Sequence, residues 1–308
     1  MPPRLFLSSG NLVADRRFEF ARDLQLRGDL TAAADLLEQT VELAPDFVSA
    51  WFMLGEIHEK LGEHEQAVAA FRKACETDPE DRHGAGLRLM RLGAEKLSDM
   101  PQAYVQSLFD QYAHRFEAEL LNDLGYRAPA LLFEAVFSVC AAARKPALFR
   151  HAIDLGCGTG LAGAAFAKRV DHFVGIDLSA GMIKEARATG IYAELEVADM
   201  VAGLRARLDA SAELILAADA FVYLSDLAPV LNEVKRVLAP DGLLAFTVET
   251  HEGVDVIIGT GLRYAHTADY VRDSIAQAGL NLVELKPASP RHEKNKPVSG
   301  LVVVAEKV

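Results

Sequence analysis

The feature that most constrains this fold is a glycine-rich loop between a short apolar run and a helical pattern. Residues 151–155 read His-Ala-Ile-Asp-Leu, the loop Gly156-Cys-Gly-Thr-Gly160 follows directly, and a helix is predicted over 161–169. A second apolar run, Phe173–Ile176, ends in Asp177. Strand, glycine turn, helix, strand and acid in this order are typical of a βαβ unit that binds a nucleoside, because the acid can accept the ribose hydroxyls.

The spacing of the glycines separates two classes of ligand. A dinucleotide fold calls for Gly-x-Gly-x-x-Gly, but Leu161 stands three positions after Gly158. The chain instead reads Asp-x-Gly-x-Gly-x-Gly from Asp154. A carboxylate at the mouth of the loop repels a pyrophosphate and attracts a ligand that carries an ammonium and a sulfonium. A dinucleotide-dependent oxidoreductase is therefore disfavoured. A lesser role for Asp177, as the cap of the next helix, stays open.

Strand-like and helical patterns alternate through the rest of the chain, which predicts a doubly wound α/β sheet. The last apolar run, Gly300–Ala305, follows Lys296-Pro297 and is expected to form an antiparallel seventh strand. Ligands of such sheets bind beyond the carboxyl ends of the strands. The expected strands are centred on Ile153, Val174, Leu195, Ile215, Ala245, Leu282 and Val302.

The N-terminal third repeats itself at an offset of 34 residues. The recurring pairs are Gly28 and Gly62, Ala33 and Ala67, Leu37 and Phe71, and Pro45 and Pro79. The glycines suit helix–helix turns, the alanines let paired helices approach closely, and the prolines end each second helix. Two helical hairpins are predicted over about 14–81, with a capping helix over about 84–97. Trp51 and Cys75 are expected to belong to their core.

The second copy of this repeat resembles a tetratricopeptide repeat (TPR), whereas the first copy is degenerate. The residues in TPR order are Trp51, Leu54, Gly55, Gly62, Ala67, Phe71, Ala74 and Pro79. Two units make at most a shallow peptide groove. A module that docks on its own enzyme domain or self-associates is therefore favoured over a site for a protein partner.

Composition and charge exclude several classes of function. The formal charge is −12, and it divides equally, because residues 1–100 hold 12 basic and 18 acidic residues and residues 101–308 hold 20 and 26. Neither part is a basic platform for nucleic acid. The three cysteines have unrelated spacings, which gives neither a disulfide framework nor a metal-ligand pattern. No apolar run approaches the roughly 18 residues of a membrane span, and a cytoplasmic location is expected.

The glycine loop and the segments after it resemble the motifs of class I S-adenosylmethionine (SAM)-dependent methyltransferases. Ile153–Gly160 is similar to their first motif, and Gly175–Met182 is similar to their second. Glu196–Met200 resembles the third strand and its acid, Leu214–Tyr223 the fourth strand and its exit, and Leu231–Val248 the next helix, turn and fifth strand. The resemblance implies a seven-stranded Rossmann-like sheet and SAM as the cofactor.

A TPR pair ahead of such a domain resembles the TPR-containing methyltransferases, a resemblance that Phe109–Phe116 and Leu124–Pro129 strengthen. It implies a TPR-like helical module over 1–100 and a methyltransferase domain over 101–308, with a helical lid at about 101–145.

The same resemblance assigns the cofactor site. Asp154 would face the ammonium, Asp177 the ribose, and Asp199 the adenine amino group; Asp199 could instead be a turn residue, and Asp219 could bind substrate or only fix its loop. Aromatic residues of the lid, Tyr104, Tyr112 and Phe116, would cover the site or simply pack between helices. The full set expected to bind the cofactor is Asp154, Gly156, Cys157, Gly158, Gly160, Asp177, Leu178, Met182, Asp199, Met200, Asp219, Tyr104 and Tyr112.

The methyl acceptor is expected to bind beside the loop Asp219–Tyr223, which lacks the Asn-Pro-Pro-Tyr of nucleic-acid amino methylation. A small-molecule acceptor is favoured, and a protein recruited by the repeats is second. The predicted catalytic residues are Tyr223, Arg263, Tyr264 and His266, with Arg291 as a second anion contact. Alternatively, His266 caps a helix and the charged run at 291–296 is a solvated hairpin. A non-catalytic SAM-binding interaction protein remains a further alternative.

Overall fold

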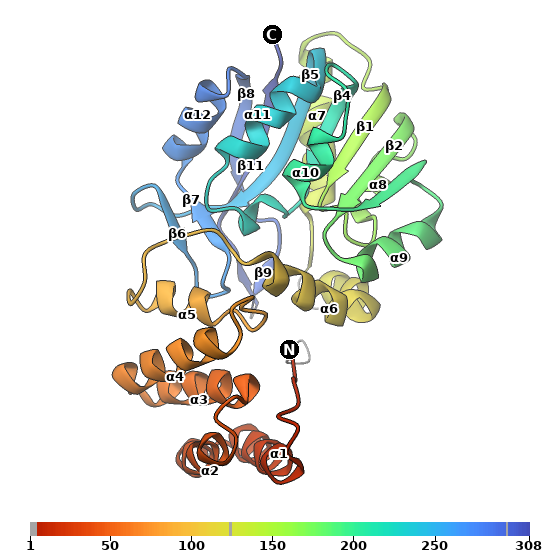
Figure 1. Ribbon diagram of the computed structural model, residues 1–308. Helices are drawn as coiled ribbons and strands as arrows, with labels where there is room; N and C mark the ends of the chain where they lie inside the picture. The colour runs from red at the N-terminus through yellow and green to blue at the C-terminus, as the bar shows by residue number, and fades with distance from the viewer. Residues whose placement is uncertain (1–4, 123–124, 294) are drawn as a thin grey trace. The chain divides into compact units, whose positions relative to one another are not determined.

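The computed structural model describes residues 5–122, 125–293 and 295–308, without the side chains of 112 and 114–122. The chain forms two compact units (Figure 1). The first unit comprises the chain up to Leu108 together with Thr260–Leu262, and the second comprises Phe109–Gly259 and Arg263–Val308. Helix α6 (Gln102–Asn122) carries the boundary between them.

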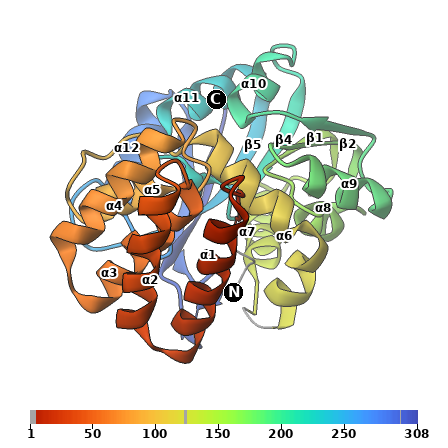
Figure 2. The same cartoon turned by 60° about the horizontal axis from the view of Figure 1, so that its bottom comes forward.

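The first unit contains two helical hairpins, as the 34-residue period predicts (Figure 2). Its helices are α1 (Leu12–Arg27), α2 (Leu30–Leu43), α3 (Val48–Leu61), α4 (His64–Thr77) and α5 (Ala85–Arg91). Gly28 and Gly62 end α1 and α3 in the left-handed region, with φ of 84° and 79°. Ala33 and Ala67 are fully buried where the paired helices meet. The fold of the repeat is therefore confirmed.

Close contacts within these hairpins explain other features of the repeat. A Cβ on Gly55 would lie 2.6 Å from the Phe71 ring, so only glycine lets α3 approach α4 this closely. Trp51 is half-buried and donates its Nε1–H to the Pro45 carbonyl at 2.7 Å, and Cys75 is also half-buried. The expected capping helix is shorter than predicted, because Gly93 adopts φ of 72° and the chain turns after α5.

The second unit contains the predicted sheet, in the order β3-β2-β1-β4-β5-β11-β8 (Figure 1). These strands are β1 (Phe149–Leu155), β2 (Val170–Asp177), β3 (Glu194–Val197), β4 (Ala212–Ala217), β5 (Leu238–Glu249), β8 (Asn281–Ala288) and β11 (Gly300–Glu306). The first five run parallel, and β11 is antiparallel to both of its neighbours. Each predicted strand centre lies in one of these seven, and the antiparallel last strand is confirmed.

The structure adds short strands and moves some boundaries. The strands that the sequence did not reveal are β6 (Val256–Ile258), β7 (Tyr264–His266), β9 (His292–Glu293) and β10 (Lys296–Pro297). β6 and β7 pair with each other, and β7 also pairs with β5. The expected turn at 239–242 lies within β5, where Asp241 has φ of 62°.

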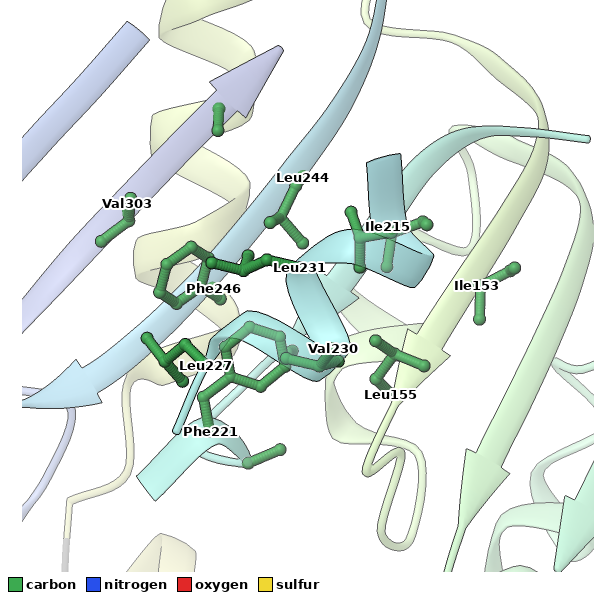
Figure 3. Close-up of a cluster of buried hydrophobic side chains, with 14 of the residues drawn as sticks. Ile153, Leu155, Ile215, Phe221, Leu227, Val230, Leu231, Leu244, Phe246 and Val303 are labelled. Carbon is green, nitrogen blue, oxygen red and sulfur yellow. The ribbon is translucent and has the colours of Figure 1, made fainter. Parts of the chain in front are cut away.

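Helices cover both faces of the sheet. α10 (Met200–Arg205), α11 (Ala228–Val237) and α12 (Ala268–Gln277) cover one face, whereas α7 (Ala128–Ala142) and α8 (Leu161–Phe166) cover the other. On β5, Leu244 and Phe246 face α11 (Figure 3), while Leu243 and Ala245 face α7, so the strand is apolar on both faces over 243–246. This double burial holds the carboxyl ends of β1, β2, β4 and β5 at one edge. Within the described ranges, no helix is both long and apolar enough to cross a membrane.

Candidate functional site

The loop after β1 has the backbone that its glycines permit. Gly156, Gly158 and Gly160 have φ of 65°, 54° and 102°, a region that favours glycine. A Cβ on Gly156 would lie 2.6 Å from that of Ala220, so this glycine also lets the loop after β1 approach the loop after β4. Cys157, within the loop, is buried beside Ile183 and Ala186, and burial raises the pKa of its thiol well above the usual value. The thiol therefore stays protonated and is no nucleophile.

Asp177 is the last residue of β2, and its carboxylate connects the glycine loop to the segment that follows β2. Its carboxylate accepts the Gly158 amide and the Ser179 amide, each at 2.8 Å. Burial raises the pKa of Asp177, while these two amides act in the opposite direction and stabilise its ionised form. The carboxylate is thus fixed beside the glycine loop, where it can accept hydroxyl groups from a ligand.

Asp154, next to the last residue of β1, is fully buried. Its Oδ2 accepts the Tyr192 hydroxyl at 2.6 Å, but its Oδ1 makes no hydrogen bond with any residue that the structure describes. Burial raises the pKa of Asp154 to about 7. A buried carboxylate oxygen without a donor is costly unless a ligand supplies one, so these residues fit a ligand with a cationic donor.

The side chains after β3 and in α9 (Ala180–Thr189) have structural partners. Asp199 is the N-cap of α10 and accepts the amides of Val201 and Ala202 at 2.9 and 3.2 Å. Its assignment to the adenine amino group stays a prediction. Met182 is fully buried in α9, whereas Leu178 and Met200 are half-buried.

Helix α6 contributes an acid that the sequence analysis did not single out. Asp110 accepts the Ser179 hydroxyl at 2.5 Å and the Gly181 amide at 3.1 Å, and it therefore supports the start of α9. The Phe109 ring meets Tyr223 edge-on at 5.4 Å. The α6 segment 109–113 thus lies against the loops after β2 and β4, as a lid would.

Of the three aromatic residues predicted to cover the site, the structure describes the side chain of Tyr104 alone. Tyr104 belongs to the first unit, where a Cβ on Gly84 would lie 2.7 Å from its ring. The side chains of Tyr112 and Phe116 lie outside the described residues.

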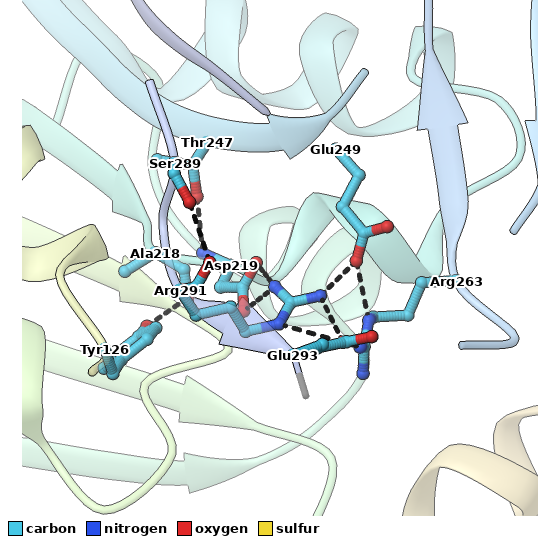
Figure 4. A network of polar contacts seen from close by, with 9 residues as sticks. All are labelled: Tyr126, Ala218, Asp219, Thr247, Glu249, Arg263, Ser289, Arg291 and Glu293. Atoms are coloured by element: carbon cyan, nitrogen blue, oxygen red, sulfur yellow. Dashed lines mark hydrogen bonds and ion pairs between the residues drawn. The ribbon is translucent and has the colours of Figure 1, made fainter. Parts of the chain in front are cut away.

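An ion-pair network around the buried Arg291 stands at the ends of β4 and β5 (Figure 4). Arg291, which is only 2% exposed, donates to both carboxylate oxygens of Asp219, at 2.6 and 2.5 Å. It also pairs with Glu249 and, at 3.3 Å, with Glu293. The Asp219 backbone has φ of 57°, and its amide donates to Thr247 Oγ1 at 2.8 Å. Arg291 therefore fixes Asp219, and the alternative in which this acid fixes its loop is favoured.

Arg263 belongs to the same network. It donates to Glu249 at 2.7 Å and pairs with Glu293. Within this network two arginines face three carboxylates, which gives a net charge of −1. Because both guanidinium groups already have internal partners, the geometry does not favour the anion-binding role expected of Arg263 and Arg291.

The remaining predicted catalytic residues are buried. His266 is fully buried in β7, and its Nε2 lies 2.9 Å from the Leu224 carbonyl. Burial lowers its pKa to about 4, so it is neutral near pH 7, and Nδ1 finds no partner in the described part of the chain. The helix cap suggested for His266 is supplied instead by Thr267, which accepts the Tyr270 amide. Tyr264 is also fully buried.

Tyr223 stands at the end of the short helix η1 (Phe221–Tyr223), close to the ion-pair network. Burial raises the pKa of its phenol, although Arg263 nearby acts in the opposite direction. A protonated phenol here can donate a hydrogen bond but is a poor base. Tyr126 lies nearby and donates its hydroxyl to the Ala218 carbonyl at 3.3 Å.

Comparisons with known proteins agree with this geometry. The pattern of the family described as "Methyltransferase domain" matches residues 152–242, and that of "Tetratricopeptide repeat" matches residues 18–82. Methyltransferase-like protein 27 of Homo sapiens is 27% identical over 177 residues, which is 56% of this chain and 66% of that protein. Malonyl-[acyl-carrier protein] O-methyltransferase of Dechloromonas aromatica is 30% identical over 154 residues, 45% of this chain and 55% of that one. The chain spans two thirds or less of the length of each of these relatives.

A solved structure supports the fold. The 1,6-didemethyltoxoflavin-N1-methyltransferase of Burkholderia thailandensis, with bound S-adenosylhomocysteine (SAH), has a TM-score of 0.53 at 16% identity and covers 70% of this chain and 93% of its own. Sheet order, glycine loop and family matches together define a class I methyltransferase domain. The chain thus carries a segment that matches a methyltransferase domain, residues 152–242, behind a segment that matches tetratricopeptide repeats, residues 18–82.

Proposed function

We propose that this protein transfers a methyl group from SAM to a small-molecule acceptor. The observation that carries the proposal is the buried Asp154, whose Oδ1 makes no hydrogen bond within the described residues, beside a glycine loop held by Asp177. When bound, SAM supplies an electrophilic methyl group on a sulfonium. Nothing in the proposal requires a metal.

Different residues at the carboxyl ends of the strands recognise different parts of the cofactor. Asp154 provides a negative charge for the ammonium, and Asp177 accepts the ribose hydroxyls, while its two amide bonds favour its ionised form against the effect of burial. The glycine loop offers backbone without side chains, so that the ligand can approach closely. Asp110 of α6 holds the start of α9 in place, because it accepts hydrogen bonds from Ser179 and Gly181.

Methyl transfer is an in-line displacement, so the protein mainly orients the acceptor and excludes water. Tyr223, a half-buried and protonated phenol, can donate a hydrogen bond that orients the acceptor. His266 acts through another residue, because its bond to the Leu224 carbonyl fixes the backbone next to Tyr223. For His266, we propose this positioning role in place of the direct catalysis expected from the sequence.

The charge of the network favours a neutral or hydroxylated small molecule as the acceptor. Arg263 and Arg291 are engaged by carboxylates, so no free cation among them invites an anion. Three of the relatives are named as O-methyltransferases, two of malonyl-[acyl-carrier protein] and one in ubiquinone biosynthesis, which supports an oxygen acceptor here. The match to tetratricopeptide repeats favours a second candidate, a protein acceptor recruited by the helical module.

Titration calorimetry with SAM and SAH tests the cofactor assignment. Asp177→Ala removes an acceptor of charge-assisted hydrogen bonds worth about 1.5–3 kcal/mol each, so the affinity for SAH should fall at least about tenfold. The matched control is Asp269→Ala, because the Asp269 side chain is 89% exposed in α12. Wild-type protein that binds neither ligand would refute the proposal. Labelled SAM with fractionated metabolites or proteins then identifies the acceptor class.

A further inference from the structure

Tyr192, which contacts the candidate cofactor site through Asp154, lies outside every motif of the sequence analysis. Tyr192 stands in the segment between α9 and β3, and its hydroxyl donates to Asp154 Oδ2 at 2.6 Å. It is half-buried overall, and its ring packs against Phe173 with centroids 5.2 Å apart.

Three glycines make room for the Tyr192 ring. A Cβ on Gly163, in α8, would lie 2.6 Å from Tyr192 Cζ, and a Cβ on Gly175, in β2, would lie 3.0 Å from Cδ1. A Cβ on Gly160, at the start of α8, would lie 3.2 Å from Cε2. Substitution at the first two positions would therefore displace the ring. The packing leaves the phenol little choice of direction, and its hydroxyl reaches Asp154.

The hydrogen bond makes the two oxygens of Asp154 different. Oδ2 is used by Tyr192, whereas Oδ1 is buried without a hydrogen bond from the residues described. A carboxylate that could rotate freely would present either oxygen to a ligand. The phenol fixes the plane of the carboxylate and so fixes the position of the oxygen that remains available.

We propose that Tyr192 is a positioning residue, which holds Asp154 so that its available oxygen receives the ammonium of the SAM amino-acid portion and which makes recognition of that portion depend on pH. The inference rests on the proposed function and adds to it a residue and a pH dependence.

The groups that face Asp154 set the direction of the pH effect. Burial, the main cause, and the charge of Asp177 raise the pKa of Asp154 to about 7, whereas the Tyr192 hydroxyl and the Gly163 amide lower it. Cys157 and Tyr126 also face it, but burial raises the pKa of both, so they stay neutral. An ammonium is attracted only by the ionised form of Asp154. Affinity for the amino-acid portion should therefore be present above pH 7 and lost as the pH falls through 7.

The test compares two ligands and three proteins by calorimetry between pH 6 and pH 8. SAH carries the ammonium, whereas 5′-methylthioadenosine keeps the nucleoside and lacks the amino-acid portion. The proteins are the wild type, Tyr192→Phe, which keeps the ring among the glycines, and the matched control Tyr270→Phe. The Tyr270 hydroxyl bonds with Leu227 and Asp226, away from Asp154.

We expect the wild-type affinity for SAH to fall about tenfold from pH 8 to pH 6, as the ionised fraction of a group titrating near 7 does. In Tyr192→Phe the pKa of Asp154 should rise, so the fall should begin at higher pH and the affinity at pH 7 should be at least about threefold weaker. Methylthioadenosine affinity should stay within about twofold throughout, and the Tyr270→Phe control should match the wild type.

The outcomes separate this inference from the proposed function. A wild-type SAH affinity that is flat from pH 6 to pH 8, an unchanged pH profile in Tyr192→Phe, or an equal loss for methylthioadenosine would overturn the inference alone. Wild-type protein that binds neither ligand would overturn both. If Tyr192→Phe does not fold, as its circular dichroism would show, the wild-type comparison of SAH with methylthioadenosine still decides whether Asp154 acts as described.

Discussion

Replacing Arg291 by Met tests the buried network at the ends of β4 and β5. The guanidinium is 2% exposed, while the side chains of Asp219 and Glu249 are 15% and 14% exposed. Removing one partner of a buried pair costs about 3–5 kcal/mol, because a charge is left without compensation. Arg263 still pairs with Glu249 and Glu293, so Asp219 is the group left alone. We therefore expect a loss near the lower end of this range, about 3 kcal/mol.

Urea unfolding can assign this loss to the correct unit. Trp51, the only tryptophan, lies in the first unit, so its fluorescence should hardly change, whereas circular dichroism follows both units. The matched control, Arg272→Met, removes an exposed pair with Asp269 and should cost under about 1 kcal/mol. Adding Asp219→Asn to Arg291→Met should recover part of the stability, since the charge left alone is gone. A loss in Arg291→Met no larger than that of the control would refute this reasoning.

Three further predictions concern other parts of the structure. His266 has a pKa lowered to about 4 from 6.5, so proton binding favours unfolding and the wild type should lose about 3 kcal/mol as the pH falls from 6.5 to 4. His266→Gln keeps a donor for the Leu224 carbonyl and should lose less over the same range; parallel acid unfolding curves would contradict this role. Gly55→Ala would press a methyl group against Phe71 and should destabilise the helical module by about 1–3 kcal/mol, as followed by Trp51 fluorescence; an unmoved transition would show that the helices can separate without cost. Asp199→Ala removes the N-cap of α10 and should cost about 0.5–2 kcal/mol in thermal unfolding, and Asn at the same position should restore most of it.

Local patterns made most of the fold predictable. Each of the seven main strands contains apolar residues at its centre, and the turn inside each helical hairpin carries a glycine with positive φ. The short strands β6 and β7 could not be predicted, because three residues carry no period and their pairing depends on β5.

The candidate site was predictable only where its residues come from a single βαβ unit. Asp154, Asp177 and the glycine loop fall into this group, since spacing alone brings them together. Arg291 could not be distinguished from a solvated charge, because its partners Asp219 and Glu249 come from distant strands. Tyr192 was missed for a similar reason: its environment is formed by glycines of α8 and β2, which are distant from it in sequence.

The position of β11 has a consequence for how the protein is made. This strand follows all the others of the sheet in sequence, yet it lies between β5 and β8 and pairs with both over its whole length. While the ribosome is still translating, β5 and β8 each present an unpaired edge, the kind of edge that other chains can join. The sheet closes only after Glu306 has left the exit tunnel, so its folding on the ribosome is delayed until then. A nascent chain that stalls shortly before residue 300 would thus expose two unpaired strand edges at once.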